Sequence, residues 1–82
     1  MKERIWFETT QCVVRVFVNE EEICGETLFV VQTHHKKTNK VLIRFGTTQQ
    51  LYSMLNSYQY SVVKNKEQYE LYMNHLSFFK LK

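Results

Sequence analysis

The apolar residues of this chain of 82 residues change their spacing near residue 46. Before that point, runs rich in Val, Ile, Thr and aromatic residues alternate between two sides, as half-buried strands do. After it, apolar residues return every three or four positions, which is the spacing of one helix face. Strands followed by helices predict an α+β domain, with an antiparallel sheet and its helices gathered on one face.

The strand-like runs divide the first part of the chain into four segments, residues 4–9, 11–18, 27–33 and 40–45. Polar residues at 19–22 and 36–39 separate the last three runs, so we expect an antiparallel four-stranded sheet of the meander type. Residues 59–64 also alternate between polar and apolar side chains. This favours a short fifth strand at a sheet edge over an extension of the first helix.

Two helices are expected after residue 46. Thr47 and Gln50 have the spacing of a capping box, and the following apolar stripe predicts a helix over residues 48–57. Asn65 and Gln68 repeat the cap signal before a second stripe, which predicts a helix over residues 66–79. The two stripes, which we expect to pack on the sheet, consist of Leu51, Met54, Leu55 and Tyr58, and of Tyr69, Tyr72, Met73 and Leu76.

Length and composition are those of one small globular domain. The apolar fraction is 44% and the charged fraction 23%, both near the average for folded proteins. No apolar run approaches the ~20 residues of a transmembrane helix. A secretory signal would be interrupted by Lys2, Glu3, Arg4 and Glu8. We therefore expect a single domain in the cytoplasm, with no membrane partner.

The sequence has no Ala, Asp or Pro and is rich in Lys, Asn, Tyr and Phe. AT-rich codons produce this composition, which suggests a low-GC bacterium, its phage or plasmid, or a virus as the source. The two cysteines, Cys12 and Cys24, form no CxxC pair and are too few for a disulfide framework. Reduced thiols are therefore expected.

Alternate residues of a strand point to opposite faces of the sheet, so the four runs can be divided between two faces. One side is purely apolar and is predicted to be the core face: Ile5, Phe7, Val14, Val16, Val18, Phe29, Val31, Val41, Ile43 and Phe45. The other side mixes charged and apolar residues: Arg4, Trp6, Glu8, Val13, Arg15, Phe17, Leu28, Val30, Gln32, Leu42 and Arg44. That side holds every arginine and the only tryptophan of the chain.

A merely solvated sheet face would be largely polar, whereas this one keeps Val, Leu, Phe and Trp among its charges. Tryptophan and arginine are also the residues enriched at interface hot spots. The preferred hypothesis is a small non-enzymatic regulatory or inhibitory protein that binds a protein partner, or a second copy of itself. Its predicted contact residues are Trp6, Arg15, Phe17, Arg44 and Arg4. The competing interpretation is that a loop or the first strand covers this face.

Nucleic acid is the alternative partner. Aromatic residues and arginines on an open sheet face can stack on bases and hold phosphates. The predicted turn beside them adds Lys36, Lys37 and Lys40, and the net charge is +3. Acidic residues count against this alternative, namely Glu8 and the Glu20, Glu21, Glu22 and Glu26 cluster predicted at the first turn.

The acidic cluster at the first predicted turn and the lysines at the second lie at opposite ends of the third strand. Such opposite charges would also suit an antiparallel homodimer.

The sequence offers little for catalysis. Cys12 has the parity of the core face, and His34 and His35 are neighbours that would point to opposite faces of a strand. Cys24 and His75 are the other candidates for nucleophilic catalysis, and Cys12, Cys24, His34 and His35 lack the short paired spacings of a structural zinc site. We therefore predict no catalytic residue, metal ligand, cofactor or small-molecule substrate.

Overall fold

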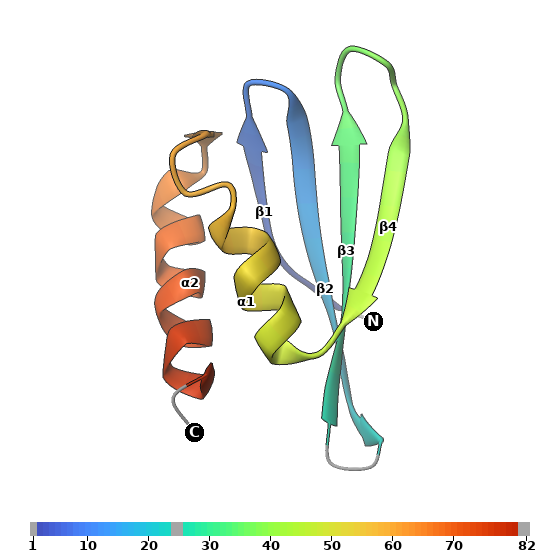
Figure 1. Ribbon diagram of the computed structural model, residues 1–82, viewed down its shortest axis with the longest axis vertical. Helices are drawn as coiled ribbons and strands as arrows, with labels where there is room; N and C mark the ends of the chain where they lie inside the picture. Colours follow the sequence, from blue (N-terminus) through green and yellow to red (C-terminus); the bar gives the residue numbers. More distant parts are fainter. Residues whose placement is uncertain (1, 24–25, 81–82) are drawn as a thin grey trace.

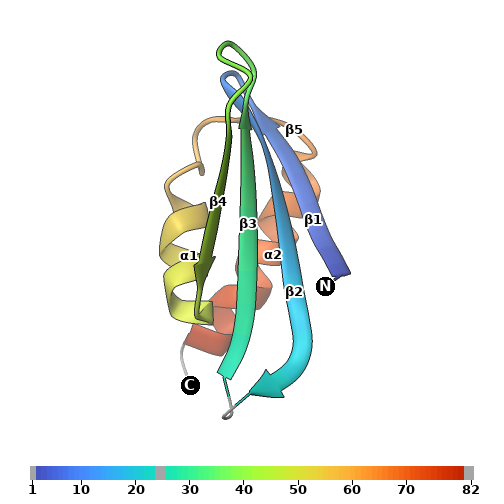
Figure 2. The same cartoon turned by 90° about the vertical axis from the view of Figure 1, so that its right-hand side faces the viewer.

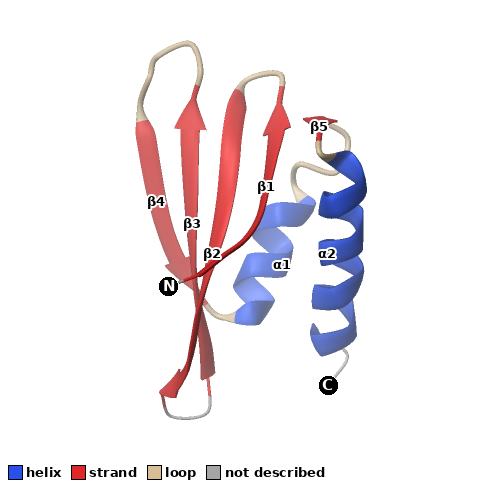
Figure 3. Cartoon of the chain, turned by 180° about the vertical axis from the view of Figure 1, so that it is seen from behind, coloured by secondary structure: helices blue, strands red, loops and turns tan. Residues whose placement is uncertain are grey.

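The computed structural model describes residues 2–23 and 26–80 and has the predicted α+β architecture (Figure 1). The elements follow the order β1 (Lys2–Thr9), β2 (Cys12–Ile23), β3 (Glu26–His35), β4 (Val41–Gly46), α1 (Thr48–Asn56), β5 (Val62–Lys64) and α2 (Lys66–Lys80). All strands are antiparallel to their neighbours, and the sheet order is β4-β3-β2-β1-β5. Both helices lie on one face of the sheet (Figure 3). The predicted fold class is confirmed.

The predicted fifth strand is present, although it is shorter than the alternating segment 59–64. Only Val62–Lys64 pairs with β1, and it lies at the edge of the sheet, as expected. The predicted turn between β3 and β4 is also present. The backbone N–H of His35 donates to the carbonyl of Lys40 at 2.8 Å, and Asn39 has a φ of 57°, a left-handed conformation that asparagine tolerates.

The prediction of a turn at residues 19–22 is wrong. β2 continues to Ile23 and β3 begins at Glu26, so the two strands extend beyond the rest of the sheet as a long hairpin (Figure 1). The register shifts between Asn19 and Ile23. Pairs form on both sides of this shift, between Asn19 and Leu28 and between Ile23 and Glu26, because backbone groups make the ladder and polar residues can take part in it. Cys24, predicted to be a reduced thiol, lies outside the described residues.

Both helices agree with the predicted ranges to within one residue at each end. The backbone N–H of Thr47 donates to Oε1 of Gln50 at 3.1 Å, which is a bond of the predicted capping box. Asn65 precedes α2, but its side-chain Nδ2 donates to the carbonyl oxygen of Trp6 at 2.6 Å. Asn65 therefore ties the start of α2 to β1.

The core lies between the sheet and the two helices. Phe7 at its centre is 0% exposed, and its ring centroid lies 5.6 Å from that of Tyr58 and 4.8 Å from that of Tyr69. The hydroxyl of Tyr69 donates to the carbonyl of Leu55 at 2.7 Å. The buried apolar residues include Phe7, Cys12, Val14, Val16, Val18, Phe29, Val31, Leu51, Leu55, Val62, Tyr69, Met73 and Leu76. The core-face prediction is thus confirmed for β2, for Phe29 and Val31 of β3 and for Phe7 of β1.

The core-face prediction is wrong for β4. Directly paired residues of neighbouring strands share a face, and Arg44 pairs with buried Val31. The helix side of β4 therefore carries Leu42 and Arg44. The opposite side carries the three residues that were predicted to be core, and they are exposed: Val41 (51%), Ile43 (54%) and Phe45 (76%).

Two tyrosines of the helix layer make the fold sensitive to alkali. Burial raises the pKa of Tyr69 and of Tyr72 from 10.0 to about 12, and the positive charge of Arg4 partly opposes this rise at Tyr72. The folded state therefore favours the protonated phenols. Their contribution to stability is complete below pH 10 and is lost as the pH rises toward 12.

We expect the urea midpoint to fall between pH 10 and 12, together with late ionisation of Tyr69 and Tyr72 in ultraviolet absorbance. The variant Tyr72→Phe removes one of the two groups and should lose less stability over that interval than the wild type. Equal losses in the two proteins would contradict the assignment to Tyr72.

Candidate protein-binding surface

The sheet face turned away from α1 and α2, here called the open face, is exposed to solvent (Figure 2). Because paired residues share a face, the strand registers align its side chains in three rows across the sheet. The first row is Phe45, Val30, Phe17 and Glu3. The second is Ile43, Gln32, Arg15 and Trp6. The third is Val41, His34, Val13, Glu8 and Lys64.

The apolar part of the open face has two exposed ends. At one end, Phe45, Ile43 and Val41 project from β4 and are all at least half exposed. At the other, Trp6 projects from β1 with 42% of its surface exposed. Apolar residues of the two middle strands connect these ends and are half-buried: Val13, Phe17 and Val30. The result is an apolar surface that spans four strands.

Three predicted contact residues lie on the open face, as expected: Trp6, Arg15 and Phe17. Trp6 is directly opposite Arg15 across the β1–β2 pair. Nε of Arg15 lies 3.8 Å from Oε1 of Glu3, and both side chains are well exposed. Such a pair contributes little to stability, so Arg15 remains able to form directed hydrogen bonds with a partner.

The other two predicted contact residues do not belong to this surface. Arg44 lies on the helix side of β4, where it lines a hollow with Leu42, Met54 and Tyr58. Arg4 is the extra residue of a β-bulge, because the partner of Glu3 is Phe17 and that of Ile5 is Val16. It therefore has no place in the three rows, and its charge acts on Tyr72 of α2.

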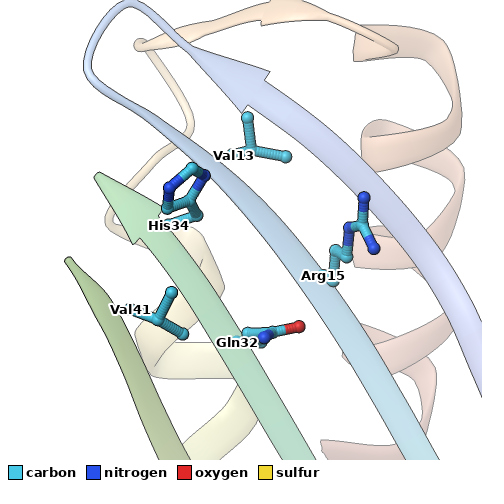
Figure 4. A pocket seen from close by; sticks show the side chains of 5 residues that line it. All are labelled: Val13, Arg15, Gln32, His34 and Val41. Atoms are coloured by element: carbon cyan, nitrogen blue, oxygen red, sulfur yellow. The ribbon is translucent and has the colours of Figure 1, made fainter. Parts of the chain in front are cut away.

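A hollow lies in the middle of the open face (Figure 4). Its lining side chains come from three neighbouring strands: Val13, Arg15, Gln32, His34 and Val41. Nε2 of His34 is 2.6 Å from Oδ1 of Asn39, so the adjacent turn holds the imidazole in place. Valine walls with polar groups between them suit one inserted side chain that has both an apolar part and a polar end.

The predicted lysines do not extend the open face as a positive track. Nζ of Lys36 donates to Oε2 of Glu8 and to the carbonyl of Thr9, both at 3.0 Å, and this ammonium lowers the pKa of the Glu8 carboxyl below its usual range. Lys64 is 3.7 Å from the same carboxylate. Lys37 and Lys40 are exposed in the turn that follows β3.

The residues weighed for catalysis are separated by the fold. Cys12 is buried, with its Sγ 3.2 Å from Oγ1 of Thr9. His34 is paired with Val13 on the open face and His35 with Cys12 on the helix side, so the prediction that they face opposite ways is confirmed. Among residues 2–23 and 26–80 there is no cluster of three or more His, Cys, Asp or Glu side chains suited to a metal ion. In the same ranges no helix has the length and apolarity to cross a membrane.

The wrong side of β4 was predicted to be core because residues 41–45 are apolar on both alternating sides except at Arg44. In such a segment the more apolar side is naturally assigned to the core. Alternation alone carries no signal that could choose between the two sides of such a strand, because it does not depend on which side the helices cover.

Comparison of the chain with models of known protein families, with curated proteins and with solved structures found no match.

Proposed function

We propose that this chain is a small non-enzymatic regulatory or inhibitory protein of the cytoplasm, and that it binds a protein partner through the open face. The main support is the apolar surface formed by Val41, Ile43 and Phe45 at one end and Trp6 at the other. A contiguous exposed apolar surface rimmed by polar groups is typical of a protein interaction site. In the described residues no element covers this face (Figure 2).

The arrangement of the face favours a partner with more than one anchoring side chain. Phe45 and Trp6 are large, exposed and separated by the width of the four-stranded part of the sheet. Aromatic residues provide much contact area at a low cost in conformational entropy. Between them lies the hollow lined by Arg15 and His34, which supplies directed polar contacts. The two aromatic side chains would supply much of the contact area, and the polar groups of the hollow would make the binding specific.

Charge distinguishes this proposal from nucleic-acid binding. The three rows of the open face contain two basic residues, Arg15 and Lys64, and two acidic residues, Glu3 and Glu8. Each basic side chain lies within 4 Å of one of the acidic ones, at 3.8 and 3.7 Å. Phosphate backbones are bound by an excess of positive charge, which these rows do not present. A protein surface needs no such excess.

Site-specific photocross-linking tests the proposal. A photoreactive phenylalanine analogue at position 6 samples the open face, and the same analogue at exposed Leu71 of α2 is the matched control. After irradiation of the cells that produce the protein, we expect a covalent adduct with another protein from position 6 and none from position 71. A nucleic-acid adduct at position 6 would instead support the nucleic-acid alternative. Equal labelling from both positions, or none, would contradict the proposed surface.

A further inference from the structure

The outer edge of β4 is unprotected. All five residues from Val41 to Phe45 are exposed, and four of them are apolar. Proteins usually protect edge strands with proline, a bulge, charged residues (lysine above all) or very short length, and Arg44 is the one charged residue of β4. β4 contains no proline or lysine, its register with β3 is unbroken, and it is twice as long as β5 at the opposite edge. Such an edge is a template for another strand.

The hydrogen-bond pattern identifies the backbone groups that point outward. The N–H of His35 donates to the carbonyl of Lys40, so these two residues form a hydrogen-bonded pair of the antiparallel ladder. Bonded pairs recur at every second residue, and Leu42 and Arg44 therefore bond to β3. The N–H and C=O groups of Val41, Ile43 and Phe45 face the open edge.

We propose that β4 pairs with β4 of a second copy of this chain, antiparallel and about a two-fold axis at Ile43. Ile43 then lies opposite Ile43 of the partner subunit, and Val41 lies opposite Phe45 of the partner subunit. This is the only antiparallel register that gives all three outward-facing residues a hydrogen-bonded partner within β4. The two sheets of five strands become one continuous sheet.

The side chains of β4 fit a copy of themselves in this register. On the open face each pair joins two apolar side chains, from Val41, Ile43 and Phe45. On the helix side Leu42 lies opposite Arg44 of the partner subunit, so the two arginines do not face each other. Like charges directly opposite would destabilise the pair. A two-fold interface requires this self-complementarity, and β4 has it.

α1 lies in the layer behind β4 and not in the plane of the sheet, where the second strand adds (Figure 2). It starts after the C-terminal end of β4, so the two-fold axis places the start of the second α1 at the opposite end of the paired strands. Leu42, in the middle of the helix side of β4, is 43% exposed. The same axis puts both open faces on one side of the joined sheet. The dimer shares Val41, Ile43 and Phe45 with the surface of the proposed function, but it rests on the backbone edge of β4 and does not use Trp6.

Cysteine cross-linking tests the register. In a background with Cys24→Ser, the variant Ile43→Cys places two thiols opposite each other, where Cα atoms of a bonded pair are about 5.5 Å apart and a disulfide can form. The matched control, Val41→Cys, places the two thiols four residues apart along the strands, roughly 13 Å. Under mild oxidation we expect at least about tenfold more disulfide dimer from position 43. Equal yields, or more dimer from position 41, would overturn the register.

Light scattering tests the association itself. The wild type should have the mass of a dimer at low and at high salt, because backbone pairing and apolar contacts are weakly screened. Ile43→Pro removes an outward N–H but no bond to β3, so it should give a monomer with an unchanged circular dichroism spectrum. If this variant unfolds, Ile43→Lys serves the same purpose at an exposed position. A monomeric wild type, or a dimer that persists in folded variants, would overturn the proposal. Trp6→Ala should leave the dimer intact while it weakens binding of the protein partner. Failure of the dimer proposal can therefore be distinguished from failure of the proposed function.

Discussion

Replacing Phe7 by Ala is expected to lower the free energy of unfolding by about 3–5 kcal/mol, which is the usual cost of removing a buried Phe ring. Phe7 is 0% exposed and its ring contacts Tyr58 of the turn after α1 and Tyr69 of α2. Alanine would leave a cavity where the sheet meets α2 and the turn after α1. A domain of this size has a total stability on the order of 5–15 kcal/mol, so the loss should be evident as a large decrease in the urea midpoint.

The control for this prediction is the neighbouring residue. Trp6→Ala removes a larger ring, but Trp6 lies on the open face and 42% of its surface is exposed. Its backbone carbonyl still accepts the bond from Asn65. The expected loss is about 1 kcal/mol or less, the range of strand preferences at exposed positions. If Trp6→Ala destabilises the protein as much as Phe7→Ala, then Trp6 is a core residue and the assignment of the open face is wrong.

The same Trp6→Ala variant should bind its protein partner about 30-fold more weakly, because a hot-spot tryptophan contributes about 2 kcal/mol or more. The indole is the largest exposed side chain at the β1 end of the open face, and Arg15 is its direct neighbour on β2. Calorimetric titration with the protein that was cross-linked to position 6 measures the change in Kd. Unfolding should not confound the titration, since Trp6→Ala is expected to cost only about 1 kcal/mol of stability or less.

Arg44→Ala is the matched control for binding. It removes an exposed arginine from the same sheet, but from the helix side of β4. We expect the affinity to stay within about twofold of the wild type, as for residues outside an interface. A large loss with Arg44→Ala and none with Trp6→Ala would place the partner on the helix side, near the hollow that Arg44 lines with Leu42 and Tyr58.

Much of the fold follows from short-range patterns in the sequence. The period of the apolar residues identifies the strands and helices, because each backbone geometry repeats its faces at a fixed interval. The capping residues Thr47 and Gln50 locate the start of α1, since their bonds are local. The long β2–β3 hairpin was missed because backbone pairing leaves no apolar signature in polar residues.

Where a strand is unbroken by a bulge, the sequence by itself determined which of its residues share a side, and it placed Trp6, Arg15 and Phe17 together. Only the tertiary structure decided which side of β4 is covered. Alternation is a local property, whereas burial depends on which face of the sheet the two helices pack against. They lie on the side of β4 that carries Leu42 and Arg44, so Ile43 and Phe45 on the opposite side are exposed. A single bulge likewise removed Arg4 from the face that its position in the sequence predicted.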